Sequence, residues 1–571
     1  MKKKLISIAL IAFVAIAGSV GISIKNNKKN QDTSYNGESP LKLNVFSMTA
    51  NYVGKQSGWF AKVIKDKFNI ELNIISYNLQ GGDSKYAAMM ASNDLGDIVI
   101  FGAEDQRYRE AIKSNLLLDW TQDNMINEYG KDIMNKFPKA IEKSKNNFGN
   151  GKSVFGINSS LANMPSNTPS EGNELTYGSV MRWDLYEQIG KPRIKTMEDL
   201  LPVLKKMQEI NPKSDLGNPT YAFSMWHDWD GNIMMNAKQF ACMEGYDELG
   251  FLLVKANEDK YQDVLDKNGY YMKTLKLYYD ANRMGLVDPD SISQKYDDFS
   301  KKMADGQVLF SWFPWTENLY NTEDRVNEGK GFKAVPFDDE IVYSNGFSNL
   351  GLSQIISIGA KTKYPERVME FIDWLYTNEG MMIATNGPKG VTWDMKNNKA
   401  ELTELGKQVR LSNNKTMPES YGGGTYDDGV NAINFNTLSQ YSINPETEEP
   451  YDYSLWSSTL NLKPSKLEES WRKDMGTITE KDYFVKNNKV AVNTSSNSSI
   501  DDLNDSAQQK QGQVASIIKN YSWKMIFAKS DTEFYSLQNE MISKAKEMGY
   551  DELINFYVTQ AKKKFAERRN K

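Results

Sequence analysis

Two periods of apolar spacing follow one another through residues 41–101. Alternating apolar and polar positions at 41–46 and 70–75 predict strands that each have one buried face. Residues 59–68 and 85–92 carry apolar positions at helical spacing. The uninterrupted apolar run within 97–101 is typical of a strand covered on both faces of a parallel sheet. This alternation of strands and helices predicts an α/β unit.

A second unit begins near Tyr177, after a stretch rich in Asn, Ser and Pro between Gly156 and Gly172. Residues 410–515 are polar and show little regular pattern, whereas residues 531–571 have the spacing of two amphipathic helices. The other predicted elements are helices at 197–209, 270–283, 297–303 and 365–376, and strands at 307–312, 341–343 and 353–358.

The first forty residues have the pattern of a targeting segment followed by a tether. Lysines flank an apolar run at 5–24, which is the charge pattern of a signal sequence and not of a folded element. Ser19 stands where the lipid-attachment motif of bacterial lipoproteins has Cys. Three outcomes stay open: cleavage after small residues and release, retention of the run as an anchor, or replacement of a lipidated Cys. Residues 25–40 are expected to be a flexible tether, so the folded part lies outside the cytoplasmic membrane.

Composition narrows the classes of function. The 571 residues include 69 basic and 74 acidic ones, for a net charge of −5, which lacks the basic excess that nucleic-acid binding needs. One cysteine, Cys242, cannot form an intramolecular disulfide. With a single histidine, His227, the chain cannot build the usual Cys/His metal sites, and no catalytic triad motif surrounds that residue. The composition therefore favours a protein that is not an enzyme and uses no cofactor or metal.

Short segments spread over nearly the whole chain after residue 41 carry a resemblance to a known family. They include Gly-Asp-Ile-Val-Ile-Phe-Gly at 96–102, Met-Arg-Trp-Asp-Leu-Tyr at 181–186, Gly-Leu-Val-Asp-Pro at 285–289, Ala-Asp-Gly-Gln-Val at 304–308, Lys-Tyr-Pro-Glu-Arg at 363–367 and Phe-Ile-Asp-Trp at 371–374. In order and spacing they resemble the family 1 extracellular solute-binding proteins of carbohydrate ABC transporters. The sequence looks most like the large, LplA-like lipoprotein branch.

The resemblance implies a two-lobed α/β fold of the periplasmic-binding-protein type (type II), with hinge strands between the lobes and helices at the C-terminus. In that family the ligand lies between the lobes, and the permease reads their closure. The expected division is residues 41–157 and 354–400 in the N-terminal lobe, 177–340 and 401–571 in the C-terminal lobe with a polar insertion around 410–515, and hinges near 156–176 and 341–353.

Candidate ligand-binding residues in the first lobe follow the predicted strands. Loops at the carboxyl ends of strands collect ligands in open α/β folds. The loop after the strand at 41–46 offers Thr49, Asn51 and Tyr52, and the loop after the strand at 97–101 offers Glu104 and Asp105. In the resembled family these loops contact sugar hydroxyls, and an Asn side chain donates and accepts at once. The alternatives are a helix-capping turn in the first loop and an acidic helix N-terminus in the second.

Tryptophan-rich segments supply the candidates in the second lobe. Trp226, Asp228 and Trp229 fall within a few residues of the only histidine, and Trp312 and Trp315 follow a buried strand. The family has an acidic and aromatic ligand segment at the first position and a strand-end Pro-Trp segment at the second, whose Trp stacks on a sugar ring. The alternatives are a packed corner at the first segment and a wedge within the lobe core at the second.

Two further candidates lie beside glycine-rich loops. Trp393 follows the Gly-Pro-Lys-Gly sequence at 387–390, and Tyr421 precedes three consecutive glycines. Glycine runs permit close backbone approach or motion, although many are only flexible loops. The spacing of Asp228, Asp230 and Asn232 is similar to that of a calcium loop, but the Gly at position six and the Glu at position twelve are missing.

The function predicted from these features is that of an exported solute-binding component of an ABC importer. It would capture an oligosaccharide between its lobes and deliver it to separate permease subunits. The chain is expected to act as a monomer, to contact the membrane only through its N-terminal segment and to bind no nucleic acid. Two alternatives stay open: an exported hydrolase or lyase acting on polysaccharide, which needs a carboxylate pair across a cleft, and a peptide-binding receptor.

Overall fold

The computed structural model of this chain describes residues 39–411, 414–495, 501 and 503–569. The expected signal or anchor segment at 1–24 and the tether up to residue 38 lie outside these residues. Across the described ranges, no helix has both the length and the apolar character needed to cross a membrane.

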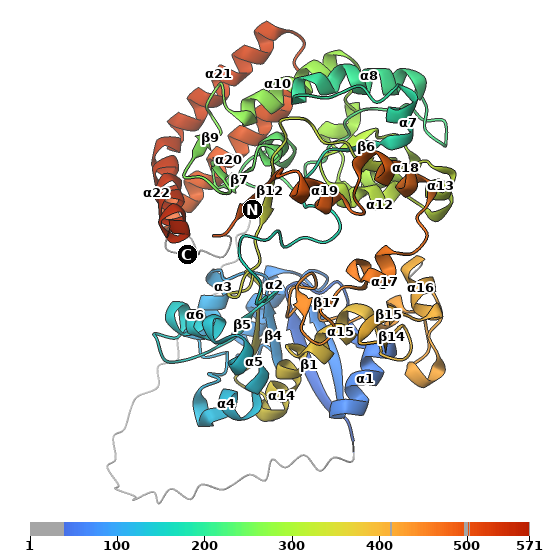
Figure 1. Cartoon of the computed structure of the whole chain (residues 1–571). Helices are drawn as coiled ribbons and strands as arrows, with labels where there is room; N and C mark the ends of the chain where they lie inside the picture. Colours follow the sequence, from blue (N-terminus) through green and yellow to red (C-terminus); the bar gives the residue numbers. More distant parts are fainter. Residues whose placement is uncertain (1–38, 412–413, 496–500, 502, 570–571) are drawn as a thin grey trace, which may run out of the picture.

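The described chain forms two lobes, which lie one above the other in Figure 1. The buried apolar residues of the first lobe come from 41–161 and 355–456. Those of the second lobe come from 175–342 and 467–565. Each lobe is thus built from two separate stretches of chain around its own core, which confirms the predicted two-lobed α/β architecture.

A six-stranded sheet lies at the centre of the first lobe, in the order β2-β3-β1-β4-β13-β5. β1 (Leu41–Ser47) pairs in parallel with β3 (Ile70–Ser76) and β4 (Ile98–Phe101), and β13 (Ile355–Ile358) runs antiparallel to β4. All four residues of β4 are buried, because helices cover both faces of the sheet. The chain enters β1 far from the second lobe, so the carboxyl ends of β1, β3 and β4 face that lobe (Figure 1).

The remaining α-helices and strands of the first lobe complete this sheet, as β2 and β5 do, or surround it. They are β2 (Gly54–Lys55), α1 (Gly58–Phe68), α2 (Asp83–Ala91), α3 (Gln106–Lys113), α4 (Met125–Tyr129), α5 (Lys131–Lys136), α6 (Pro138–Phe148), β5 (Ile157–Asn158), α14 (Pro365–Leu375), α15 (Asn378–Asn386), β14 (Trp393–Lys396), β15 (Lys399–Leu402), α16 (Glu404–Leu411), β16 (Ile443–Asn444), β17 (Glu449–Pro450) and α17 (Ser457–Leu460).

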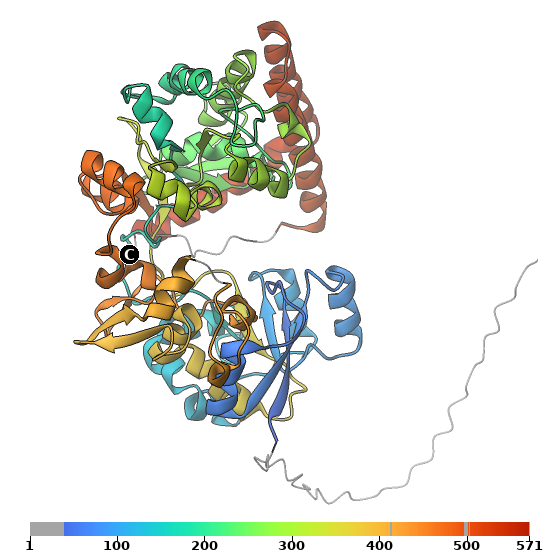
Figure 2. The same cartoon turned by 90° about the vertical axis from the view of Figure 1, so that its right-hand side faces the viewer.

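The second lobe has a three-stranded antiparallel sheet in which β6 (Val180–Arg182) lies between β10 (Phe310–Ser311) and β11 (Phe332–Ala334). Ser311, the last residue of β10, pairs with Val180, the first residue of β6. Both lie at the edge of this sheet where the chain arrives from the first lobe. The C-terminal helices α20 (Asp505–Ile526), α21 (Asp531–Glu547) and α22 (Tyr550–Arg569) lie along one side of this lobe (Figure 2).

The other elements of the second lobe are mostly helical. They are α7 (Trp183–Gln188), α8 (Leu200–Ile210), α9 (Gln239–Met243), β7 (Tyr246–Leu249), β8 (Leu252–Lys255), β9 (Tyr261–Asp263), α10 (Tyr270–Arg283), α11 (Tyr296–Asp305), α12 (Glu317–Tyr320), α13 (Glu323–Glu328), β12 (Val342–Asn345), α18 (Lys466–Met475), α19 (Glu480–Lys486) and β18 (Val490–Asn493).

The structure differs from the sequence prediction in where residues 401–460 belong. The prediction places 401–571 in the C-terminal lobe, but Val409, Phe435 and Trp456 are buried in the core of the first lobe. These apolar residues are spaced irregularly within a polar stretch, so no periodicity marks the surface on which they pack.

The stretch at 410–515 is also more regular than its polar composition predicts. It contains α17, α18, α19, β18 and the start of α20. Ser465 and Glu468 form a capping box at the start of α18, and the Thr479 side chain accepts the backbone N–H of Asp482 at the start of α19. These helices are short and polar on the outside, so their capping residues are a stronger signal than their apolar spacing.

Within the described residues, the chain passes between the lobes in three segments, at 162–174, 346–354 and 461–465. The first two lie side by side: Ser170 N–H donates to the Asn345 carbonyl at 2.9 Å, and Phe347 N–H donates to the Thr168 carbonyl at 3.3 Å. β12 leads into the second segment and pairs in parallel with β18. The third segment joins α17 to α18.

Candidate functional site

The loop after β1 lies at the edge of the first lobe that faces the second lobe. Ser47 holds the loop, since its hydroxyl accepts the backbone N–H of Ala50 at 3.0 Å and donates to the Ile433 carbonyl at 3.0 Å. Thr49 Oγ1 donates to the Asn434 carbonyl at 2.8 Å. The side chain of Asn51 is exposed. The loop is therefore fixed by residues 433–434, while Asn51 stays available to donate and accept hydrogen bonds.

Tyr52 in the same loop is partly committed to the protein. Its hydroxyl donates to the Lys55 carbonyl at 2.7 Å, and 39% of the residue is exposed. Its ring therefore offers an apolar surface at this edge, with the polar end held in place.

The loop after β4 contains two neighbouring acids, Glu104 and Asp105, whose carboxylates have different partners. Glu104 is largely buried, and its Oε1 forms an ion pair with Lys143 and accepts Asn158 Nδ2–H at 2.6 Å. Asp105 instead caps α3: its Oδ1 accepts the backbone N–H of Arg107 at 3.0 Å, and its carboxylate pairs with the Arg107 guanidinium. Asp105 thus has the helix-capping role that the sequence left open as an alternative.

The tryptophan-rich loop of the second lobe turns one indole inward and one outward. Trp226 is buried, and its ring centroid lies 4.3 Å from that of Phe299. Trp229 is 45% exposed and stacks on Tyr296, with centroids 4.4 Å apart and ring planes 22° apart. Asp228 Oδ1 accepts the backbone N–H of Tyr296 at 3.0 Å, which joins this loop to the start of α11. Trp226 is therefore a core residue, contrary to the sequence prediction.

The two tryptophans after β10 divide in the same way. Trp312 is 4% exposed, packs edge-on against Phe240 at 4.1 Å, and donates its indole N–H to the Tyr278 hydroxyl at 2.6 Å. Trp315 is half-buried and stacks toward Trp229, with centroids 6.0 Å apart and planes 24° apart. Trp312 thus fills the lobe core, which was the alternative interpretation, whereas Trp315 lies beside Trp229.

Together, Trp229, Tyr296 and Trp315 form a surface that we call the aromatic platform. Residues 221–223 form isolated parallel bridges to Val308 and Val287, so the loop that follows them lies at the edge where β10 also ends. This is the edge from which the connections to the first lobe leave. Partly exposed aromatic rings at this edge are suited to stacking on an apolar ligand face.

Sequence reasoning missed Tyr296, the middle ring of the aromatic platform. It lies 67 residues beyond Trp229 in a charged helix start, Lys-Tyr-Asp-Asp, where a tyrosine carries no signal of its own. It also missed Lys143 and Asn158, the partners of Glu104, which come from α6 and β5. Only the folded chain brings these residues together.

The remaining candidates lie in the first lobe away from the aromatic platform. Trp393 is buried, packs against Trp456 and donates its indole N–H to the Gly387 carbonyl at 2.8 Å. Tyr421 is half-buried against the first-lobe core. Trp393 is thus a core residue, which corrects its assignment as a ligand contact.

The calcium-like spacing does not produce a cluster of ligands. Asp230 accepts the backbone N–H of Met235 at 2.8 Å and the indole N–H of Trp523 at 3.1 Å, and burial raises the pKa of its carboxyl. In the part of the chain that the structure describes, no three His, Cys, Asp or Glu side chains gather so that they could hold a metal ion.

Comparison with known proteins assigns the family. The model of the bacterial extracellular solute-binding protein family matches residues 59–390, which is more than half of the chain. The protein is a bacterial extracellular solute-binding protein. Membership places this solute-binding protein in a class that is exported and that binds ligands. No curated protein sequence matches the chain.

Solved structures share the fold of this solute-binding protein at low sequence identity. The substrate-binding protein FusA of an S. pneumoniae ABC transporter, in complex with kestose, is 15% identical with a TM-score of 0.60, and the match covers 92% of this chain and 100% of that one. The N-glycan transport protein NgtS of Streptococcus pneumoniae is 14% identical with a TM-score of 0.54, covering 93% and 100%. The alginate-binding protein AlgQ2 without calcium ion is 15% identical with a TM-score of 0.57, covering 92% and 98%. These likenesses extend over both lobes.

Proposed function

We propose that this solute-binding protein captures an oligosaccharide between its two lobes and delivers it to the permease of an ABC importer. The observation that carries the proposal is the aromatic platform, which lies at the edge of the second lobe toward the first. Opposite it, the first lobe offers the exposed Asn51 and Tyr52 and the carboxylate of Glu104. Rings that stack on sugar C–H faces and polar groups that select hydroxyls are the two contacts an oligosaccharide needs.

The fold relatives support this ligand class, since their names describe kestose, N-glycan and alginate as what they bind or transport. In the proposed mechanism a sugar bridges both lobes and shifts the population toward a closed arrangement by its differential affinity. The segments at 162–174 and 346–354, hydrogen-bonded to each other, serve as the hinge. The protein acts as a monomer on the outer side of the membrane, with its N-terminal segment as the only attachment.

Calorimetry against a panel of fructan, glucan, mannan, uronate and N-acetylhexosamine oligosaccharides tests the ligand class. We expect stoichiometric binding of one class and unchanged sugar on chromatography after long incubation. Product formation would instead establish a polysaccharide-active enzyme, and binding of peptides alone would establish a peptide receptor.

Trp315→Ala tests the site within the same assay. The variant should weaken binding of the selected oligosaccharide by about 1–3 kcal/mol, as truncated aromatic anchors do, while the thermal midpoint stays close to that of the parent. Affinity equal to that of the parent would remove Trp315, and with it the aromatic platform, from the proposed site.

A further inference from the structure

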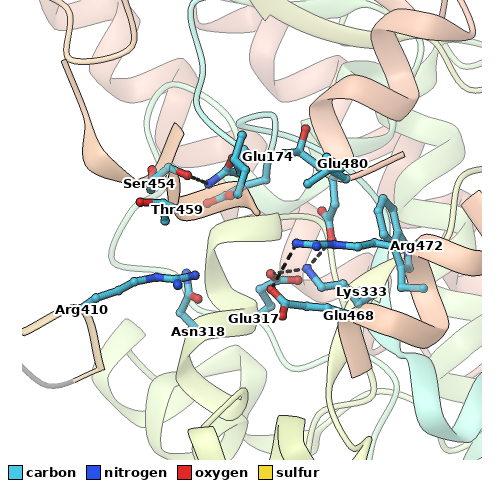
Figure 3. Close-up of a pocket in the computed structure, with 15 residues that line it drawn as sticks. Glu174, Glu317, Asn318, Lys333, Arg410, Ser454, Thr459, Glu468, Arg472 and Glu480 are labelled. Carbon is cyan, nitrogen blue, oxygen red and sulfur yellow. Dashed lines mark hydrogen bonds and ion pairs between the residues drawn. The ribbon is translucent and has the colours of Figure 1, made fainter. Parts of the chain in front are cut away.

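A polar pocket has walls from both lobes (Figure 3), and Leu460, the residue before the connection at 461–465, lies in its lining. Its volume of about 180 Å³ has room for several water molecules. The first lobe contributes Arg410 from α16 together with Ser454 and Thr459, and the second lobe contributes residues of α12, β11, α18 and α19. Because both lobes form its walls, a change in the angle between the lobes changes the distances across it.

The wall in the second lobe contains a buried lysine held by two carboxyl groups. Lys333 Nζ lies 2.8 Å from Glu317 Oε1 and 3.0 Å from Glu480 Oε1. Both acids are buried, and the second oxygen of each carboxyl has no hydrogen-bond partner among the described residues. Two buried carboxylates around one ammonium leave one negative charge or one proton in excess.

Of the two other acids that line the pocket, Glu174 adds to this excess, whereas Glu468 has a cationic partner. Glu468 pairs with Arg472 at 3.8 Å, and Glu174 lines the same pocket from the first connection between the lobes. Burial raises the pKa of Glu317 well above its ordinary value, and the charge of Glu480 raises it further. Burial also raises the pKa of Glu174, and Glu480 again adds to the effect. The charged and titratable side chains that line this pocket with Glu317 are Glu174, Glu468, Glu480, Lys333 and Arg472 from the second-lobe side and Arg410 from the first lobe.

Arg410 is the cation that the first lobe brings to this pocket. Its side chain is exposed and extends from the end of α16 toward Asn318 of the second lobe (Figure 3). Within the described residues it forms no hydrogen bond or ion pair, whereas Lys407 on the same helix pairs with Glu404 at 2.6 Å. An unpaired arginine thus points at a wall with more carboxyl groups than cations.

We propose that this pocket is an electrostatic latch between the lobes, in which Arg410 is attracted by the excess carboxylate of the opposite wall. The attraction favours lobe arrangements in which α16 lies close to α12. Dissolved salt screens it, and a proton taken up by Glu317 weakens it because one negative charge is lost. Salt and pH therefore change the balance between lobe arrangements even without a ligand.

Single-molecule energy transfer on the full chain, without ligand, tests the latch. Dyes attached at K139C in the first lobe and K206C in the second are specific, since both positions are exposed and Cys242 is buried. Raising the salt from about 0.01 M to about 1 M shortens the screening length from about 30 Å to about 3 Å. The ratio of the lobe arrangements in the parent should change by a factor of about two to five, the size expected for a partly exposed charge contact.

At low salt, R410Q should already show the ratio of lobe arrangements that the parent shows at high salt. K407Q is the matched control because it removes an equal charge from the same helix, and its ratio should change with salt as that of the parent does. An R410Q variant that responds to salt like the parent and K407Q would overturn the latch. Because Arg410 is exposed, this variant is expected to fold.

In a second arm, the ratio of lobe arrangements of the parent should move toward its high-salt value as pH falls from about 8 to about 5, while that of a folded E317Q variant should not. A full pH response in E317Q would exclude Glu317 as the proton site.

Discussion

The two lobes present different chemistry to each other from the same kind of position, the loop after a strand. In the first lobe, this edge carries polar side chains held by the protein, Glu104 by Lys143 and Asn158 and Thr49 by Asn434. The exposed Asn51 and the partly exposed ring of Tyr52 lie beside them. In the second lobe, the edge carries stacked rings that hold one another. Under the proposed function, we therefore expect the first lobe to contribute mainly hydrogen bonds to the ligand and the second lobe mainly apolar contact.

The largest expected effect is a difference in the free energy of unfolding between alanine variants of two second-lobe tryptophans that the sequence does not distinguish. Trp312→Ala removes a buried indole and leaves a cavity, so the free energy of unfolding should fall by about 3–5 kcal/mol. Trp229→Ala removes a ring that is 45% exposed and should cost about 1 kcal/mol or less. Urea unfolding of both variants measures the difference. Equal losses would mean that the aromatic platform is part of the core, and the contrast between the lobes would fail.

Buried acids differ in their partners: Glu104 in the first lobe and Glu317 in the second each pair with a lysine, whereas Glu340 in the second lobe forms no ion pair among the described residues. Glu340 accepts the backbone N–H of Phe337 and the Ser179 hydroxyl, while Lys489 donates to nearby backbone carbonyls. Burial raises the pKa of Glu340 to about 8. The folded protein therefore holds this proton more tightly than the unfolded chain does.

Because the pKa of Glu340 is higher in the folded protein than in the unfolded chain, the contribution of this residue to the free energy of unfolding falls as pH rises. The stability that Glu340 contributes is fully present below the unfolded pKa of about 4.5 and is lost as pH rises through about 8. Relative to the parent, Glu340→Gln should gain on the order of 3–4 kcal/mol of unfolding free energy between pH 5 and pH 8. Urea unfolding at both pH values measures this, with Glu404→Gln, an exposed acid, as the control. A constant difference between variant and parent would show that Glu340 is ionised throughout.

The polar side of the comparison depends on Glu104. Under the proposed function, Glu104→Gln should weaken oligosaccharide binding by about 1–2 kcal/mol, because a hydrogen bond to a charged acceptor contributes more than one to a neutral amide. Asp105→Asn is the matched control: Asn caps a helix as well as Asp does, so affinity and stability should both stay near those of the parent. Calorimetry that finds unchanged affinity for the Glu104 variant would leave hydroxyl selection to Asn51 and the backbone.

The sequence was most informative where the signal is local. The apolar run within 97–101 and the proline-initiated helix at 365–376 correspond to β4 and α14, because strand burial and helix starts depend on neighbouring residues. Trp312 and Trp315 stand three positions apart, yet only contacts with Phe240 and Tyr278, distant in sequence, bury the first. Likewise, nothing near residues 401–460 indicates which lobe they pack on. Pairings between distant segments decided both the site and the division into lobes.

The smallest expected effect concerns how the second lobe holds its rings in place. Asp228 was predicted as a ligand contact, but its carboxylate accepts the backbone N–H of Tyr296, so we expect it to act as a positioning residue. Asp228→Ala should weaken oligosaccharide binding by about 0.5–1 kcal/mol, the usual contribution of an acid at a helix N-terminus. It should also reduce the near-ultraviolet circular dichroism of the stacked Trp229 and Tyr296 rings.

Asp297→Ala, which removes an exposed acid from the same helix turn, should leave the dichroism of the rings unchanged. If Asp228→Ala lost affinity with the ring signal intact, Asp228 would contact the ligand directly. The second lobe would then share the polar chemistry of the first, and the division of labour between the lobes would be incomplete.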